Sequence, residues 1–232
     1  SDFFDKLENI FQYLIKDVPS TISYFIPDYT DYNKRILFLL LEKGFVKPDE
    51  SFIQKYLQNE TNNDRFNYYL YPKMKEFLEE KIQKQIEFKI LPKYAEEIST
   101  FEEKCQIGEN DLYICSLIRS DSVEDFITYV NRTNLSLLTK IKPSIYETNS
   151  FLIDKNPSLI EYAAFFGSIQ IIRYLKYNNV PLTPSLWLYT VHSNNAELIH
   201  FLEENEVKPD KSINEEETLI GPYDNVLIES IK

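Results

Sequence analysis

Glycine, cysteine and long apolar runs are all scarce in this chain of 232 residues. Its four glycines stand apart from one another, whereas phosphate-binding loops need them close together and all-β folds need many in turns. Two cysteines are too few for a disulfide framework, which favours a reducing compartment, cytoplasmic or nuclear. The longest apolar stretch, residues 36–41, is far too short to cross a membrane. We also expect no signal peptide, because the first residues are acidic and amphipathic.

Positive charge is scarce as well. The formal net charge is −12; residues 1–92 hold 13 Lys and Arg against 15 Asp and Glu, and residues 93–232 hold 12 against 22. A negative field of this size repels phosphate backbones and anionic lipids, so we expect no nucleic acid and no membrane partner. One group of lysines alternates with glutamates and predicts either a solvated helix face or an anion-binding surface. Its members are Lys73, Lys75, Lys81, Lys84 and Lys89.

Residues suited to catalysis or metal binding are few. The only histidines, His192 and His200, have no Cys or His at metal-ligand spacing, and Cys105 and Cys115 lie in helical apolar patterns typical of small core residues. Neighbouring glutamates on a helix point in different directions, so the glutamate pairs indicate solvated faces. These pairs are Glu79-Glu80, Glu96-Glu97 and Glu102-Glu103. We therefore expect no catalytic residue, no metal and no cofactor.

Helical periodicity, by contrast, runs through the whole chain. We expect helices over residues 3–19, 31–43, from about 48 to 57, 73–90 and 94–106. The second should be buried nearly all round, and Pro92 should end the fourth, whose apolar stripe is Met74, Phe77, Leu78, Ile82 and Ile86. No stretch alternates apolar and polar residues as a strand does, so we predict mostly helix and almost no sheet.

The second half of the chain repeats itself with an offset of 27 residues. Residues 162–180 align with 189–207, so that Leu175 falls on Leu202. Each unit predicts a short helix, a turn, a second helix and a loop, and such pairs in a fixed period are typical of a solenoid. The two predicted turns are Gly167-Ser168 and Asn194-Asn195.

A longer-range match links the two halves of the chain. Residues 41–51 match 202–212, with seven of the eleven positions identical. In both segments we expect a helix to end at a left-handed residue, Gly44 or Asn205, before a Pro-Asp pair that starts the next helix. The N-terminal half is therefore expected to consist of diverged helix pairs of the same kind.

Residues 158–175 resemble the ankyrin repeat, whose signature is Thr-Pro-Leu-His-x-Ala-Ala-x-x-Gly-His. The match is best at Ala163-Ala164, which let paired helices approach closely, and at Gly167, which turns the chain between them. The ankyrin resemblance covers roughly residues 110–232. Most of the chain is similar to the ankyrin-repeat proteins expanded in trichomonad protists, in which an N-terminal helical domain of unknown function precedes the repeats. This resemblance implies a cytoplasmic or nuclear binding scaffold without catalysis.

The predicted fold is all-α, a helix-pair solenoid of diverged ankyrin-type repeats with short connecting fingers. We expect an N-terminal helical domain over residues 1–108 and ankyrin-type repeats over residues 109–232, the last one incomplete. The offset of 27 is shorter than the ankyrin period of about 33 residues, so the fingers should be too short for a β-hairpin. Residues 131–156 exceed one connector and should form an irregular loop or a short extra helix.

Five residues are expected to bind a protein partner: Phe165, Phe166, His192, Ser193 and Thr183. Phe165 shares a repeat position with His192, and Phe166 shares one with Ser193; the ankyrin resemblance places both positions on the concave groove. Burying a phenylalanine ring is worth roughly 1.5–3 kcal/mol. Either residues 131–156 or another element covers the two rings, or a partner does. Trp187 falls on a core leucine position and is expected either in the core or in contact with a partner.

Two features near the end of the chain leave alternatives open. The acidic stretch within residues 203–217 predicts a solvated helix end and loop, or a docking site for a basic peptide. Residues 223–232 predict the first helix of one more pair, with too few polar positions to act as a cap. We hypothesise that the chain is the N-terminal piece of a longer repeat protein, or that this helix packs on a neighbour and gives self-association. The alternative is that it folds back on its own preceding pair.

The function predicted from these features is a non-catalytic protein–protein interaction scaffold that binds through its concave and loop surfaces. The alternatives are a carboxylate-based hydrolase and a purely structural module of a longer repeat protein. A groove lined by one position from each repeat favours the scaffold, whereas a cleft of carboxylates with raised pKa values favours the enzyme.

Overall fold

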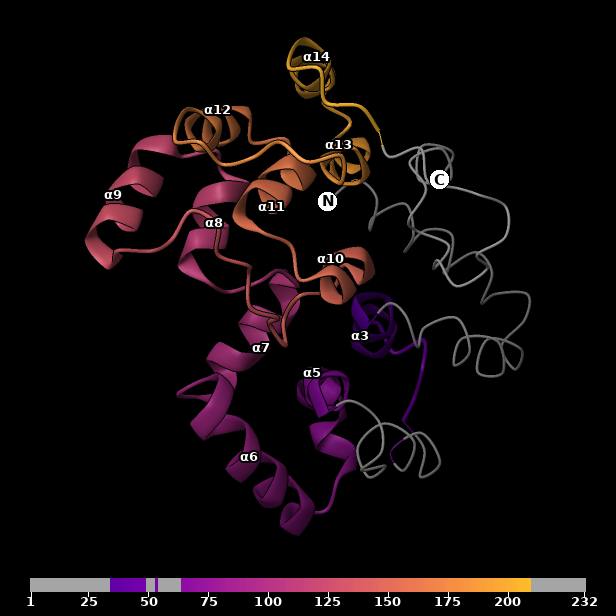
Figure 1. Cartoon of the computed structure of the whole chain (residues 1–232). Coiled ribbons are helices and arrows are strands. Elements are labelled where there is room, and N and C mark those ends of the chain that lie inside the picture. The colour runs from indigo at the N-terminus through magenta and orange to yellow at the C-terminus, as the bar shows by residue number, and fades with distance from the viewer. Residues whose placement is uncertain (1–33, 49–52, 54–63, 210–232) are drawn as a thin grey trace, which may run out of the picture. The chain divides into compact units, whose positions relative to one another are not determined.

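The computed structural model describes residues 34–48, 53 and 64–209, and most of these are helical (Figure 1). Helix accounts for 65% of the described residues, which contain no strand and one isolated bridge between Lys140 and Ser158. The prediction of an all-α chain is confirmed for this part. The helices expected over residues 3–19 and 223–232, and nearly all of the one expected from about 48 to 57, lie outside the described residues.

The chain divides into two compact units. The first comprises residues 1–109 together with 145–150, and the second comprises residues 110–144 together with 151–232. Each unit has its own cluster of buried apolar side chains. The chain therefore returns to the first unit for a short stretch after it has entered the second.

Helix α3 (Lys34–Glu42) is buried on most of its circumference, as its apolar run predicts. Gly44 follows it in the left-handed region, at φ +71°. The Gly44 amide donates to the Leu41 carbonyl oxygen at 3.1 Å, and the Phe45 amide donates to the Leu40 carbonyl oxygen at 2.9 Å. These two bonds form the glycine-terminated helix end that the sequence predicts at this position.

The single helix predicted over residues 73–90 is wrong, because the chain is broken within it. Helix α5 (Asp64–Met74) leads into a 3₁₀ turn, η2 (Lys75–Phe77). Helix α6 (Glu80–Tyr94) begins only after two residues, 78 and 79, with extended backbone. Two shorter helices therefore replace one long one.

The break changes which side chains face the core of the first unit. Met74 and Leu78 are buried before α6 begins, and Ile86 and Ile90 are buried within it. Phe77, predicted on the same apolar stripe, is 50% exposed. In a straight helix, side chains four residues apart point in directions that differ by about 40°, so an apolar stripe with this spacing gradually winds away from a fixed core. The break compensates for this rotation, so that both segments present apolar side chains to one core.

The prediction that Pro92 ends its helix is also wrong, because α6 continues to Tyr94. A proline removes its own backbone donor and displaces the preceding turn, and because only two helical residues follow Pro92, this disturbs only the end of α6. The chain leaves the helix at Ala95, which is extended with φ −157° and ψ 154°. Helix α7 (Ile98–Ile107) consequently begins later than the expected start at Tyr94.

Polar contacts join the helices of the first unit. The Tyr69 hydroxyl of α5 donates to the Cys105 carbonyl oxygen of α7 at 2.5 Å. The Lys73 ammonium lies 3.1 Å from the Glu42 carboxylate and 2.8 Å from the Glu102 carboxylate. Burial by itself lowers the pKa of Lys73, but hydrogen bonds to Glu102 and Glu42 outweigh it and raise that pKa above its usual value. Lys73 of α5 thereby connects α3 and α7 through one shared cation.

The described part of the second unit contains three helix pairs. The first pair is α8 (Tyr113–Arg119) with α9 (Val123–Thr133), the second is α11 (Leu159–Phe166) with α12 (Ile169–Tyr177), and the third is α13 (Leu186–Ser193) with α14 (Ala196–Glu204). A shift of 27 residues places the bounds of α11 and α12 on those of α13 and α14, which confirms the predicted helix–turn–helix repeat. Helix α11 packs against both α8 and α13, and α12 packs against α9 (Figure 1).

The turns inside these pairs are left-handed where the sequence predicts it. Gly167 has φ +71° and Asn194 has φ +49°. A capping box starts α11: the Ser158 hydroxyl accepts a bond from the Glu161 amide, and the Ser158 amide donates to the Glu161 carboxylate at 2.8 Å. Local side-chain chemistry therefore defines both ends of this helix.

The prediction that Asn205 takes the left-handed position is wrong, because Glu206 takes it, with φ +56°. The Val207 amide donates to the Leu202 carbonyl oxygen at 3.0 Å, a bond that requires the left-handed residue directly before Val207. Asn179, 27 positions earlier, has φ +64° and ends α12 in the same way. The Asn205 side chain instead donates to the Phe201 carbonyl oxygen at 2.6 Å.

The long connection between α9 and α11 carries a short helix, α10 (Ser150–Lys155), which confirms the extra helix expected within residues 131–156. Phe151 of this helix is buried in the apolar cluster of the second unit. The connection between α12 and α13, residues 178–185, contains no strand. The described connecting segments of this unit are thus loops and one short helix rather than hairpins.

Thr190 buries a hydroxyl where the preceding repeat has Ala163. The residue is fully buried, and its Oγ1 has no hydrogen-bond partner among the described residues. We expect Thr190→Val, which keeps the shape and removes the hydroxyl, to raise the free energy of unfolding by about 1 kcal/mol. Urea denaturation followed by circular dichroism measures this change. Ser193→Ala serves as the contrast and should lower stability, because the Ser193 hydroxyl donates to the Thr190 carbonyl oxygen at 2.8 Å. A lower stability of Thr190→Val would contradict the expectation.

Candidate functional site

Aromatic side chains of successive repeats meet at the last turns of α11 and α13. Phe165 and His192 hold the same repeat position, and their ring centroids lie 4.9 Å apart. Phe166 packs against Phe165 at 5.0 Å and against Tyr162 at 4.8 Å. We call Phe165, Phe166 and His192 the aromatic row. It joins one position from each of two repeats into a continuous surface.

The aromatic row is partly open to solvent. His192 is exposed, whereas Phe165 and Phe166 are half-buried. The ring of Phe151 in α10 stacks on Phe165, with centroids 6.0 Å apart and planes 16° apart, and lies 4.5 Å from His192. The segment of residues 131–156 therefore covers part of Phe165, one of the two alternatives expected from the sequence, and leaves His192 accessible.

The other two candidate residues lie outside these ring contacts: Ser193 follows His192 at the end of α13, and Thr183 precedes the first turn of α13. The Ser193 hydroxyl donates to the Thr190 carbonyl oxygen and accepts a bond from the Asn195 amide at 3.2 Å, so it shapes the turn. Thr183 is exposed, and its hydroxyl lies 2.8 Å from that of Ser185. The ring contacts bring together three of the five residues predicted to bind a partner, and neither Ser193 nor Thr183 takes part in them.

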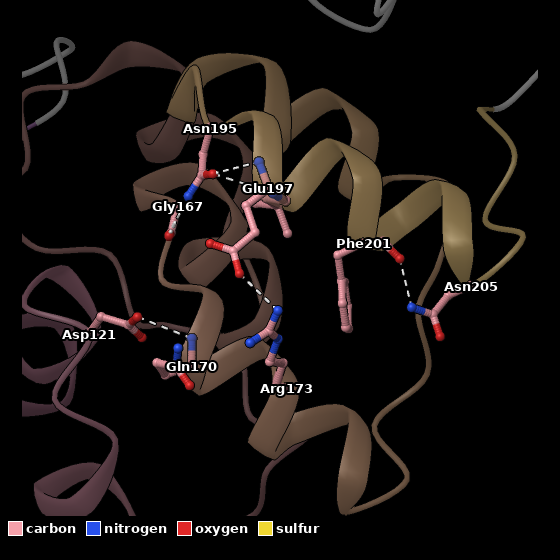
Figure 2. Close-up of polar contacts among 9 residues, drawn as sticks. Asp121, Gly167, Gln170, Arg173, Asn195, Glu197, Phe201 and Asn205 are labelled. Carbon is pink, nitrogen blue, oxygen red and sulfur yellow. Dashed lines mark hydrogen bonds and ion pairs between the residues drawn. The ribbon is translucent and has the colours of Figure 1, made fainter.

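Side chains at the turns connect each helix pair to the next. The Asp121 carboxylate, at the turn between α8 and α9, accepts a bond from the Gln170 amide at 3.1 Å (Figure 2) and another from the Ile171 amide at 3.0 Å. The Asn195 side chain donates to the Gly167 carbonyl oxygen at 3.1 Å (Figure 2). The first bonds satisfy amides of the first turn of α12, which have no partner within their own helix. The bonds of Asp121 hold the second helix pair against the first, and the bond of Asn195 holds the third pair against the second.

The sequence pattern did not single out Phe151 or Asp121. Phe151 belongs to an apolar run, residues 151–153, that falls outside the repeat period, and that run was the available signal for a covering element. Asp121 stands at the same turn position as Gly167 and Asn194, and like them it is left-handed, with φ +48°. Its alignment with these residues was the signal for a turn, but nothing local indicates that its carboxylate reaches α12.

Trp187 lies at the edge of the core of the second unit. Its ring is half-buried and packs against that core, and its Nε1 donates to the Val207 carbonyl oxygen at 2.8 Å. The indole therefore connects α13 to the end of α14. This placement fits the core alternative of the two expected for Trp187.

Groups associated with catalysis or metal binding are dispersed over the described residues. Cys105 and Cys115 are both buried, as predicted, and burial raises the pKa of the Cys105 thiol. Across residues 34–48 and 64–209, no group of three or more His, Cys, Asp or Glu side chains is placed to hold a metal ion. None of the helices described there combines the length and the apolar character needed to cross a bilayer.

Comparison with known proteins does not identify a family. No protein-family model matches the chain, and neither the curated proteins nor the solved structures gave a match. The resemblance to ankyrin-repeat proteins, and to those of trichomonad protists, therefore stays a prediction from the sequence.

Proposed function

We propose that this chain is a non-catalytic protein–protein interaction scaffold whose diverged ankyrin-type helix pairs stack as a solenoid. The aromatic row carries the proposal. Two successive repeats place ring side chains at one position, in contact with each other, and His192 leaves that surface open to solvent. A partner that follows the repeats would contact the same position in each pair.

The chemistry of the aromatic row suits a protein partner. Aromatic side chains are enriched in the buried centres of protein interfaces and supply much of the binding energy there. Ser193, which follows His192 in the chain, and the exposed Thr183, which precedes α13, are further candidate contacts for a partner. The net charge of −12 disfavours phosphate backbones and anionic lipids as alternative partners. The same composition fits a cytoplasmic or nuclear protein.

The supporting framework favours binding without large rearrangement. Phe151 and Tyr189 pack under the row with ring centroids 5.0 Å apart, and the hydrogen bonds of Asp121 and Asn195 hold successive pairs together. A surface that is already ordered loses less conformational entropy when a partner binds. The half-buried state of Phe165 and Phe166 also reduces the cost of leaving these rings without a partner.

The sharpest test replaces His192, because it is the exposed member of the row. His192→Ala should reduce capture of at least one protein from the source cells about fivefold or more, the loss expected on removing an interface hot spot. The measurement is affinity capture with quantitative mass spectrometry on the intact chain. Helicity by circular dichroism should stay unchanged, because His192 is exposed.

The matched control is Tyr177→Ala, which removes an aromatic ring that is 86% exposed on α12, outside the row. Tyr177→Ala should capture the same proteins as the unmodified chain. Equal capture by all three proteins would refute binding through the aromatic row. Phe165→Ala is less informative, since Phe165 is half-buried and removal of its ring also lowers stability.

A further inference from the structure

Helix α6 presents a basic face that the proposed scaffold function does not use. Lys81, Lys84, Gln85, Phe88 and Lys89 line an open hollow on this helix. Their spacing places them along one side of α6, while Ile86 and Ile90 on the other side are buried in the core of the first unit. We call these five lining residues the basic face.

The basic face combines solvent-exposed lysines with an exposed ring. Phe88 is 80% exposed, although it stands between lysines on a helix with a complete apolar side of its own. Lys84 lies 2.5 Å from Glu80, but both side chains are more than two-thirds exposed, so this ion pair contributes little. Lys81 and Lys89 form no ion pair with any described residue. The hollow therefore offers cations beside an apolar ring.

The end of α14 carries the complementary charge. Glu203, Glu204 and Glu206 are exposed there; the last turn of α14 holds no basic residue, and the nearest cationic candidate on that helix is His200, whose Nδ1 lies 3.1 Å from the Glu203 carboxylate. Carboxylates at a helix C-terminus are destabilised by the partial negative charge of the helix dipole, so they gain from an external cation. The exposed Lys208 follows Glu206 after one residue, so this end carries three carboxylates against one ammonium, and the exposed Pro209 after it adds apolar surface. We call Glu203, Glu204, Glu206 and Pro209 the acidic end.

We propose that the basic face of α6 in one copy of this chain binds the acidic end of α14 in a second copy. Lysines contact carboxylates, and the ring of Phe88 packs on apolar surface next to them. Because the two surfaces are different, each copy uses one to bind the next copy and offers the other to a third. Such head-to-tail contacts form a ring where the rotation between copies closes and an open chain where it does not, and in both cases association increases as concentration rises. This inference is independent of the aromatic row.

Sedimentation of the full chain tests the proposal. At low salt the average mass should rise with concentration above that of one chain, and about 0.5 M salt should return it towards that of one chain, because exposed ion pairs are screened. The double substitution Lys81→Glu with Lys89→Glu should weaken association about tenfold or more. Lys47→Glu with Lys43→Glu makes the same change in net charge at exposed positions off the basic face, and should weaken it far less.

A charge exchange makes the test decisive. A chain with Glu204→Lys and Glu206→Lys should fail to associate with itself, as should the chain with Lys81→Glu and Lys89→Glu. Mixing the two variants should restore association. The acidic face of the Lys81→Glu, Lys89→Glu chain then binds the basic end of the Glu204→Lys, Glu206→Lys chain, and the unchanged basic face of the second chain binds the unchanged acidic end of the first. Single chains at every concentration, association insensitive to these substitutions, or no recovery on mixing would each overturn the proposal.

Discussion

Phe126→Ala should lower the free energy of unfolding by about 3–5 kcal/mol, the usual loss for a buried phenylalanine. Phe126 lies on α9 and has no exposed surface. Its ring meets that of Tyr174 on α12 edge to face, with centroids 6.0 Å apart. The substitution therefore opens a cavity between the first and second helix pairs and removes an aromatic contact worth about 0.5–1.5 kcal/mol. Urea denaturation followed by circular dichroism measures the loss.

Tyr177→Ala is the matched control for this experiment. Tyr177 lies on α12 near Tyr174, but its side chain is 86% exposed, so its removal should change stability by less than about 0.5 kcal/mol. Similar losses for Phe126→Ala and Tyr177→Ala would show that the contact between α9 and α12 does not stabilise the fold.

Asp121→Ala should lower the free energy of unfolding by about 2 kcal/mol, through two effects. The substitution removes the carboxylate that accepts bonds from the Gln170 and Ile171 amides, and these amides then lose their partner. It also places alanine in the left-handed region, at φ +48°, where Asp is better tolerated. The same denaturation experiment measures the effect.

Two further substitutions at this position separate the two effects. Asp121→Gly relieves the left-handed strain but still removes the acceptor, so it should lose about 1 kcal/mol. Asp121→Asn keeps an acceptor oxygen and tolerates the left-handed conformation, so it should lose least. If Asp121→Asn loses as much as Asp121→Ala, the bonds to α12 do not contribute as described.

Local sequence signals predicted the helix pairs of the second unit well. The offset of 27 residues, the left-handed turns at Gly167 and Asn194, and the buried Cys105 and Cys115 all agree with the structure. Helical periodicity, turn preferences and apolar spacing act within a few residues, so they are visible without the fold. For the same reason the chain as described has almost no sheet.

The same local signals failed where contacts with other segments decide where a helix breaks or ends. The apolar spacing over residues 73–90 fits one long helix, yet the chain breaks before α6 so that both segments reach one core. Pro92 is tolerated because only two helical residues follow it, so the distortion that its ring causes affects only the end of α6. Asn205 has the right preference for a left-handed position, but the bond from Val207 to Leu202 places that position at Glu206.

The candidate functional site also has features that the sequence predicts and features that depend on the tertiary structure. The sequence by itself determined that Phe165 and His192 occupy equivalent positions at the ends of paired helices, because equivalence follows from the repeat alone. Only the tertiary structure decided that their rings touch, that Phe151 covers one of them, and that Asp121 reaches the amides of α12. Contacts between residues distant in the chain depend on how helices pack, and packing is set by all the buried side chains together rather than by any local pattern.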